Sequence, residues 1–170
     1  MTTAPERFAA WLSTDIAPVL RERGFTKTRS TFHRRAPAGW GVVDFQKSQW
    51  GSKLETRFTI NLAVALDRLT TARGDDPSRK PLENRSHWRC RIGRALGVED
   101  RWWSVTEATD LRPLTDEVLD DLARVLPLIE ERLDDAGFLS AAMASPSLGL
   151  IQGFRPHELM DLLAPEPRSP

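Results

Sequence analysis

The stretch VVDFQKSQWGSKLETRFTINLAV, residues 42–64, decides the fold. Apolar side chains alternate with polar ones on both sides of a short polar segment, a pattern typical of two antiparallel strands joined by a turn. Alternation in the second strand places on one face Thr56, Phe58, Ile60, Leu62, Val64 and Leu66. Val43 and Phe45 are expected to pack against them from the first strand. The pattern predicts a hairpin of strands 40–49 and 55–66 with one face in the core.

The other face of this predicted hairpin is polar. Strand parity brings together Trp40, Val42, Asp44, Gln46, Ser48, Arg57, Thr59 and Asn61, with His33, Arg35, Arg89 and Arg91 from flanking strands. Short hydrogen-bonding groups and Arg, both of which make directional contacts, are frequent in this set. Three interpretations stay open: a solvated face, an internal polar network, and a binding site for a ligand or partner. For a binding site, the candidate residues are His33, Asp44, Gln46, Ser48, Arg57, Asn61 and Arg91.

A helix is predicted before the sheet. Thr3 and Glu6 have the spacing of a capping box, and an apolar stripe with helical period follows them. Gly24 is a natural end for this helix. Pro18 lies inside the pattern, so the helix is expected to be kinked or split.

Helices are also predicted after the sheet. The longest covers residues 115–136, with Thr115 as its N-cap and Gly137 as its end. Two short helices are expected over residues 138–144 and 156–163, before a loose tail that contains proline.

Further segments complete the expected sheet. Residues 25–35 form a strand that is irregular before Thr31, and residues 87–96 and 101–106 form two short strands, or a strand and a helical turn. Residues 67–86 are polar and contain two Pro and one Gly, so they are expected to form a long exposed loop.

The order of these elements predicts an α+β fold. We expect an N-terminal helix, an antiparallel sheet of about four or five strands, and C-terminal helices packed on one sheet face. Residues 1–137 are expected to form a single α+β domain, and residues 138–170 a C-terminal helical extension with a loose tail. In the segment around Trp102 and Trp103, one ring is expected in the core and the other on the polar side.

Length and composition exclude several classes of protein. A chain of 170 residues fits one domain, and 40% apolar with 28% charged residues is ordinary for a globular protein. No apolar run approaches the ~20 residues that cross a bilayer, and the start MTTAPERF lacks the pattern of a secretory signal. Cys90 is the single cysteine, which rules out an internal disulfide and a four-cysteine zinc site. These features favour a cytoplasmic protein without a cofactor.

Charge is unevenly distributed along the chain, although the net charge is zero. Residues 1–94 carry 18 Lys or Arg and 9 Asp or Glu, whereas residues 95–170 carry 6 and 15. Either the two halves pack together and neutralise each other, or the first half offers a basic surface to an anionic partner.

No motif of a known catalytic or metal site is present. The sequence has no glycine-rich phosphate loop and no pair of His at the spacing of metal ligands on a helix. His87 and Cys90 would supply two ligands, whereas zinc needs three or four. Parity also brings His33, Asp44 and Ser48 to one face, but Ser48 lies mid-strand, without the tight turn of a nucleophile. We therefore expect no metal site and no catalytic triad.

The polar face also lacks the pattern of a nucleic-acid surface. An RNA-binding sheet carries exposed aromatic rings among basic residues on its central strands. Here the centre of the face carries Asp44, Gln46, Thr59 and Asn61. Asp44 is instead expected to form a cross-strand ion pair with Arg57.

Short segments along the chain carry a family resemblance. They are IAPVLRERGF, the phenylalanine of TFHRR, VVDFQKSQWG, RFTINLAV, RCRIG and RWWSV. In these segments, from about Ile16 to Leu133, the chain resembles the bacterial family called domain of unknown function 4304. The resemblance implies a single domain with the order of elements given above, and it implies no reaction. The residues that recur in the family include Gln46, Ser48, Asn61 and Arg91.

The leading hypothesis is a non-catalytic binding or interaction module that uses the polar face of its sheet. Its partner would be an unknown protein or a small polar ligand. An alternative is an enzyme acting on a small anionic substrate, with Arg57 and Arg91 holding the anion and His33 or Asp44 as acid or base. A third possibility is weak nucleic-acid binding through the basic first half. The enzyme hypothesis predicts a closed pocket, and a flat, open face would contradict it.

Overall fold

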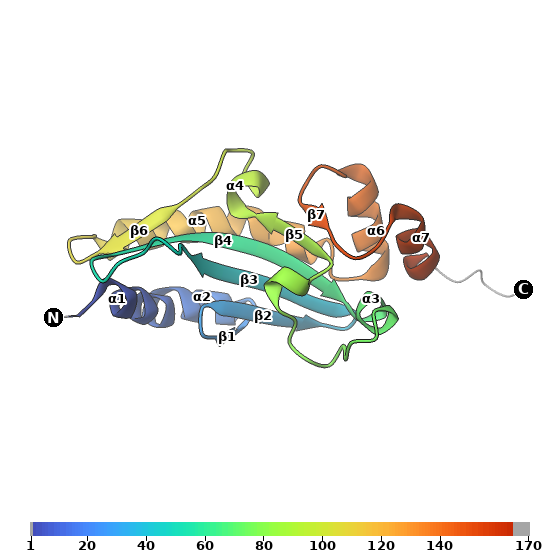
Figure 1. Cartoon of the computed structure of the whole chain (residues 1–170), viewed down its shortest axis with the longest axis horizontal. Helices are drawn as coiled ribbons and strands as arrows, with labels where there is room; N and C mark the ends of the chain where they lie inside the picture. Colours follow the sequence, from blue (N-terminus) through green and yellow to red (C-terminus); the bar gives the residue numbers. More distant parts are fainter. Residues whose placement is uncertain (1, 165–170) are drawn as a thin grey trace, which may run out of the picture.

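The computed structural model describes residues 2–164 and shows one antiparallel sheet with helices packed along one face (Figure 1). Its seven strands are β1 Thr26–Thr28, β2 Thr31–Ala36, β3 Gly39–Lys47, β4 Glu55–Leu66, β5 Trp88–Arg91, β6 Trp103–Thr106 and β7 Leu150–Ile151. The strand order is β1-β2-β3-β4-β5-β7, and β6 pairs with the other half of β4. The α+β prediction is confirmed, with seven strands in place of about four or five. A turn splits the first predicted strand in two, and β7 is too short to show an alternating pattern.

Helices precede, interrupt and follow the sheet. They are α1 Ala4–Trp11, α2 Ala17–Glu22, α3 Asp67–Ala72, α4 Ile92–Ala95, α5 Leu111–Glu130, α6 Asp135–Ala144 and α7 Pro156–Leu163. A π-helical turn, Leu12–Ile16, joins α1 to α2, and a 3-10 turn, Glu83–Arg85, precedes β5. None of the helices within residues 2–164 is both long enough and apolar enough to cross a membrane.

The predicted hairpin is confirmed as β3 and β4, and its register decides which face is buried. Phe45 lies opposite Ile60 and Val43 opposite Leu62. All four side chains are completely buried, together with aromatic rings of α1 and the apolar stripe of α5. A slip of one residue would turn every one of these side chains to the other face. Because burying each large side chain is worth about 1.5–3 kcal/mol, the core side of the hairpin is strongly specified.

The first helix begins and is interrupted as its sequence predicts. The Thr3 side chain accepts from the Glu6 backbone N–H, and the Glu6 carboxylate accepts from the Thr3 N–H at 2.8 Å, which completes the capping box. The helix then splits at the π turn, where the Ala17 N–H bonds the Leu12 carbonyl. Pro18 follows within the first turn of α2, where its missing N–H costs little.

The prediction for the long helix was wrong at both ends. Helix α5 begins at Leu111 and not at residue 115. Its N-cap is Asp110, whose carboxylate accepts the backbone N–H of Arg112 in the first turn. Thr115, the predicted cap, lies inside the helix and donates its hydroxyl to the Leu111 carbonyl at 2.6 Å. Gly137 does not end the helix but lies in the first turn of α6, where Asp134 accepts its N–H at 2.7 Å. A Cβ there would lie 2.2 Å from a backbone oxygen, so this close approach requires glycine.

Residues 67–86 do not form one exposed loop, as the sequence had predicted. Residues 67–72 continue directly from β4 as α3, and its Leu69 is completely buried in the core. Residues 76–86, which we call the strap, cross the polar face of the sheet before β5 (Figure 1). The polar composition of the strap suits this place, because it lies between a polar sheet face and water.

The C-terminal segment docks on its own chain as far as the structure describes it. Strand β7 pairs with β5 and extends the sheet, and Phe138 and Leu159 are buried in the common core. The predicted helix 156–163 is confirmed, and that over 138–144 begins three residues earlier, at Asp135. The predicted loose tail lies, from residue 165 onward, outside the described residues.

Candidate functional site

The strap is fixed to the polar face of the sheet by side chains of β2, β3 and β5. The Nε2–H of His33 donates to the carbonyl of Pro81 at 2.9 Å, and the indole N–H of Trp40 donates to that of Pro77 at 2.9 Å. Arg89 and Glu83 form two parallel hydrogen bonds of 2.8 and 2.9 Å, the geometry in which an arginine–carboxylate pair is strongest. The strap therefore covers one part of the polar face and leaves the rest open.

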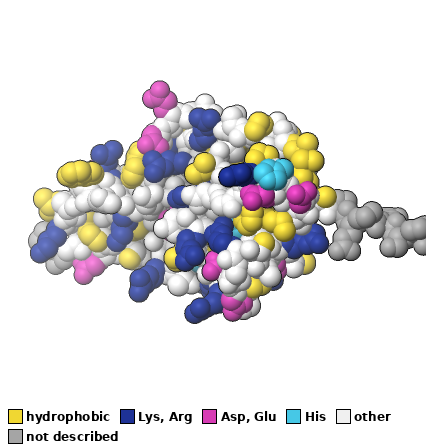
Figure 2. All heavy atoms as spheres, turned by 45° about the vertical axis from the view of Figure 1, so that its right-hand side comes forward, with side chains coloured by type: hydrophobic (Ala, Val, Ile, Leu, Met, Phe, Trp, Pro, Cys, Tyr) yellow, Lys and Arg dark blue, Asp and Glu magenta, His cyan; other side chains and the backbone are white. Residues whose placement is uncertain are grey.

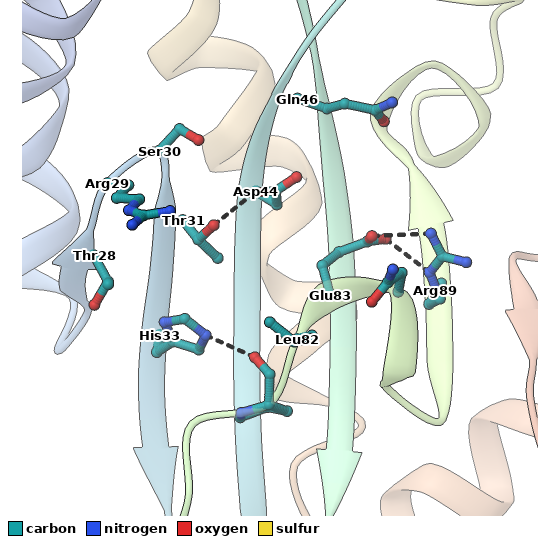
Figure 3. Close-up of a pocket in the computed structure, with 12 residues that line it drawn as sticks. Thr28, Arg29, Ser30, Thr31, His33, Asp44, Gln46, Leu82, Glu83 and Arg89 are labelled. Carbon is teal, nitrogen blue, oxygen red and sulfur yellow. Dashed lines mark hydrogen bonds and ion pairs between the residues drawn. The ribbon is translucent and has the colours of Figure 1, made fainter.

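A hollow of about 690 Å³ remains between the strap, the sheet and the β1–β2 turn. We call it the hollow, and it is lined by Thr28, Arg29, Ser30, Thr31, His33, Asp44, Gln46, Pro81, Leu82, Glu83, Asn84 and Arg89 (Figure 3). Its volume lies within the range of about 300–1,000 Å³ typical of small-molecule sites. Three of the seven residues predicted from the sequence line it: His33, Asp44 and Gln46.

The floor of the hollow is a row of cross-strand hydrogen bonds. Thr31 lies opposite Asp44 and donates its hydroxyl to Oδ1 of Asp44 at 2.6 Å. On the next strand Asn61, 6% exposed, donates from Nδ2 to Oε1 of Gln46 at 2.7 Å. Within the described residues, no protein group donates to Oδ2 of Asp44 or accepts from the amide nitrogen of Gln46. Asp44 is half-buried and Gln46 is exposed, so the floor combines an internal network with one acceptor and one donor that face the solvent of the hollow.

His33 forms the wall under the strap. Its side chain is 6% exposed, and burial lowers its pKa below the usual value, with Lys80 adding to the effect. The hydrogen bond to Pro81 and the charge of Asp44 oppose this change without cancelling it. Nε2 is used by the strap, and Nδ1 is enclosed by protein without a hydrogen-bond partner among the described residues. The imidazole is therefore neutral near pH 7 and holds the strap.

The other four predicted residues do not line the hollow. Of these, Asn61 is linked to it only through its hydrogen bond to Gln46. Ser48, on the loop after β3, accepts at its hydroxyl from the backbone N–H of Trp50 at 3.2 Å. Arg57 and Arg91 lie 5.8 and 5.6 Å from the ring of Trp102, and Arg91 also pairs with Asp100. As predicted, the Trp102 ring is on the polar side, whereas that of Trp103 is buried against Phe58.

The predicted ion pair between Asp44 and Arg57 is not formed among the described residues. Register explains the difference, because the residue opposite Asp44 is Asn61, and Arg57 lies four residues before Asn61 in β4. Thr31 takes the place of the arginine as the donor to Asp44. The carboxylate therefore keeps one oxygen available to the hollow.

Sequence reasoning missed the contributions of the β1–β2 turn and of the strap. Arg29 and Ser30 are the two turn residues between the paired Thr28 and Thr31, a turn that was hidden within one predicted strand. Glu83 and Asn84 come from the strap, and no local pattern indicates which sheet face a loop will cross. The three turn signals in 67–86, two Pro and one Gly, indicated a loop but not its position.

His87 and Cys90, weighed above as metal ligands, have other roles. Nδ1 of His87 accepts the backbone N–H of Leu66 at 3.0 Å, and burial together with Arg73 lowers the pKa of His87 to about 3. Burial raises the pKa of the Cys90 thiol to about 11, so it is not a reactive thiolate. Within residues 2–164, no cluster of three or more His, Cys, Asp or Glu has the arrangement of a metal site.

A second, apolar hollow of about 460 Å³ lies between α6, β7 and α7. Figure 2 shows hydrophobic side chains gathered on this side of the molecule. Met143, Leu150 and Met160 line it and are at least half exposed. It shares no lining residue with the polar hollow, and its lining contains no charged side chain.

Comparison with known proteins identifies the family of the chain. The model of the family described as Domain of unknown function (DUF4304) matches residues 16–131, more than half of the chain. The chain belongs to the DUF4304 family. No curated protein and no solved structure gives a significant match. The match includes β1 to β6 and all of α5, so the hollow lies entirely within the DUF4304 region, whereas α6, β7 and α7 lie beyond it.

Proposed function

We propose that this DUF4304 domain is a non-catalytic binding module that holds a small polar ligand in the hollow. The observation that carries the proposal is the floor of the hollow, where Oδ2 of Asp44 and the amide nitrogen of Gln46 lack protein partners. A polar ligand supplying one donor and one acceptor would satisfy both groups. Small-molecule sites typically combine a concave surface with a few such convergent polar groups.

The chemistry of His33 argues for binding rather than catalysis. A general base must place a free nitrogen within hydrogen-bond reach of the proton that it removes. In His33 one nitrogen is used by the Pro81 carbonyl, and the other is enclosed by protein. The two arginines expected to hold an anionic substrate, Arg57 and Arg91, lie against Trp102 and not in the hollow. These positions do not favour the enzyme alternative.

A defined panel of compounds tests the proposed function. The panel contains amino acids, short peptides, sugars, nucleosides and polyamines, each added to the isotope-labelled protein while backbone amide signals are followed by NMR. We expect at least one compound with a Kd below about 1 mM to move the signals of β2, β3 and residues 80–84. Asp44→Asn keeps the acceptor for Thr31 and replaces the free oxygen by a donor, so it should weaken that binding at least about tenfold.

The control for this experiment is Arg112→Gln, which changes an exposed charged residue in the first turn of α5, outside the lining of the hollow. This variant should bind like the wild type. The proposal fails if no compound moves the signals around the hollow, or if Asp44→Asn binds as tightly as the wild type.

A further inference from the structure

The β1–β2 turn places an arginine at a backbone position that favours glycine. Arg29 has a φ of +57°, and within the described residues it is the one non-glycine residue with a positive φ. Two-residue hairpin turns require a positive φ at their first central position, which glycine adopts without a steric cost. Backbone strain of this kind is concentrated at functional sites. Here the strained residue lies at the rim of the hollow (Figure 3).

Positive charge from two separate segments meets at this rim. Arg29 comes from the turn and lines the hollow. Lys80, from the strap, lies beside the rim, because its Nζ donates at 3.3 Å to the hydroxyl of Thr28, a lining residue. No carboxylate of the described residues forms an ion pair with Arg29 or Lys80. Arg89, the other cation that lines the hollow, is neutralised by Glu83. The uncompensated positive charge is therefore confined to the side of the β1–β2 turn.

Negative charge lies on the floor. Asp44 is half-buried, and it accepts a hydrogen bond from the neutral Thr31, not from a cation. The hollow thus has an unneutralised carboxylate at the floor and unneutralised cations at the rim. A ligand with only an anionic group would be repelled by the floor, and one with only a cationic group by the rim.

We infer that the ligand of the hollow is a small zwitterion. Its anionic group, a carboxylate or a phosphate, binds Arg29 and Lys80, and its ammonium group binds Asp44. The planar guanidinium can offer two parallel N–H groups to either anion. Opposite charges on the two sides of the hollow also fix the orientation of the ligand. This inference rests on the proposed function, because it names the ligand class of the same hollow.

Matched probes test the inference by titration calorimetry at pH 7 and low salt. O-Phosphoethanolamine is compared with inorganic phosphate and with ethanolamine, and glycylglycine with N-acetylglycine and with glycinamide. We expect one of the two zwitterions to bind at least about tenfold more tightly than each of its two counterparts, which carry charge of one sign only. Which zwitterion does so decides between a phosphate and a carboxylate.

Two variants of one residue separate recognition from folding. Arg29→Gln and Arg29→Gly should each weaken the binding of the preferred zwitterion at least about tenfold, and Arg29→Gly relaxes the backbone, so its loss of binding cannot be attributed to misfolding. Arg112→Gln is the control and should bind normally. The inference is overturned if neither zwitterion outperforms its counterparts, or if both Arg29 variants bind like the wild type. If neutral polar compounds occupy the hollow and the zwitterions do not, the inference fails and the proposed function stands.

Discussion

Protonation of His87 is expected to destabilise the protein as the pH falls below 6.5. The imidazole is 1% exposed, accepts the Leu66 N–H at Nδ1 and packs edge-on against Phe154 at a centroid distance of 5.7 Å. Burial and the nearby charge of Arg73 lower its pKa to about 3, whereas the ordinary value is 6.5. A proton on Nδ1 would remove the acceptor for Leu66 and leave a charge in the core.

The magnitude follows from the difference in proton binding between the two states. Because the unfolded state binds the proton first, the contribution of His87 to stability is complete above pH 6.5 and declines as the pH falls towards about 3. At pH 5 the unfolded imidazole is protonated and the folded one is not, so the contribution of His87 to the free energy of unfolding is about 2 kcal/mol smaller than at pH 7.5. This value holds as long as the folded pKa is well below 5.

Urea unfolding followed by tryptophan fluorescence at pH 7.5, 6.5 and 5 measures the effect. The matched variant is His87→Asn, whose side-chain oxygen can replace Nδ1 as the acceptor for Leu66 and does not titrate. His33, whose pKa is also lowered, contributes to both proteins and cancels in the difference. The variant should be less stable at pH 7.5, and its deficit should shrink by about 2 kcal/mol at pH 5. Parallel stability curves for the two proteins would refute the assignment.

Three further substitutions have defined outcomes. Arg29→Gly should leave the free energy of unfolding unchanged or raise it by up to about 1 kcal/mol, since the gain from relaxing the positive φ exceeds or equals the entropy cost of glycine; a loss above 1 kcal/mol in urea unfolding would contradict this. Gly93→Ala should lower it by at least about 2 kcal/mol, because the added Cβ would lie 2.2 Å from a backbone oxygen, whereas Gly51→Ala, with contacts of 3.5 Å, is the tolerated control. Gln46→Ala should cost about 1 kcal/mol, the value of one hydrogen bond, because Gln46 is exposed and its removal lets water reach the amide of the buried Asn61; a loss of several kcal/mol would mean that the polar face is a buried structural network.

The fold could be predicted where a local sequence pattern determines which side chains are buried or where a helix begins. The alternation through Phe58, Ile60 and Leu62 predicted the hairpin and its buried face, and the capping box at Thr3 predicted the start of the first helix. Alternation did not predict the register, because Asp44 lies opposite Asn61 and not beside Arg57. The start of α5 could not be found in the same way, because Asp110 and Thr115 are both good caps and the choice depends on packing. Thr115 is used elsewhere, since its hydroxyl accepts the indole N–H of Trp11 at 2.8 Å.

The candidate site could be predicted only in part, for a physical reason. Strand parity placed His33, Asp44 and Gln46 on one face, and all three line the hollow. Parity does not say how far apart residues of one face lie. Arg57 and Arg91 were therefore predicted in the same site, whereas they lie against Trp102 and do not line the hollow. Nor does it place Arg29 and Lys80, because their positions depend on a turn inside a predicted strand and on the path of the strap.

The most direct test of a ligand site in the hollow is a crystal structure of the protein with the tightest-binding compound of the panel. Our account predicts the compound between β2, β3 and the strap, with a donor within hydrogen-bond distance of Oδ2 of Asp44 and an acceptor at the amide of Gln46. A compound bound instead in the apolar hollow between α6 and α7, or against Trp102, with the polar hollow filled by solvent, would contradict it.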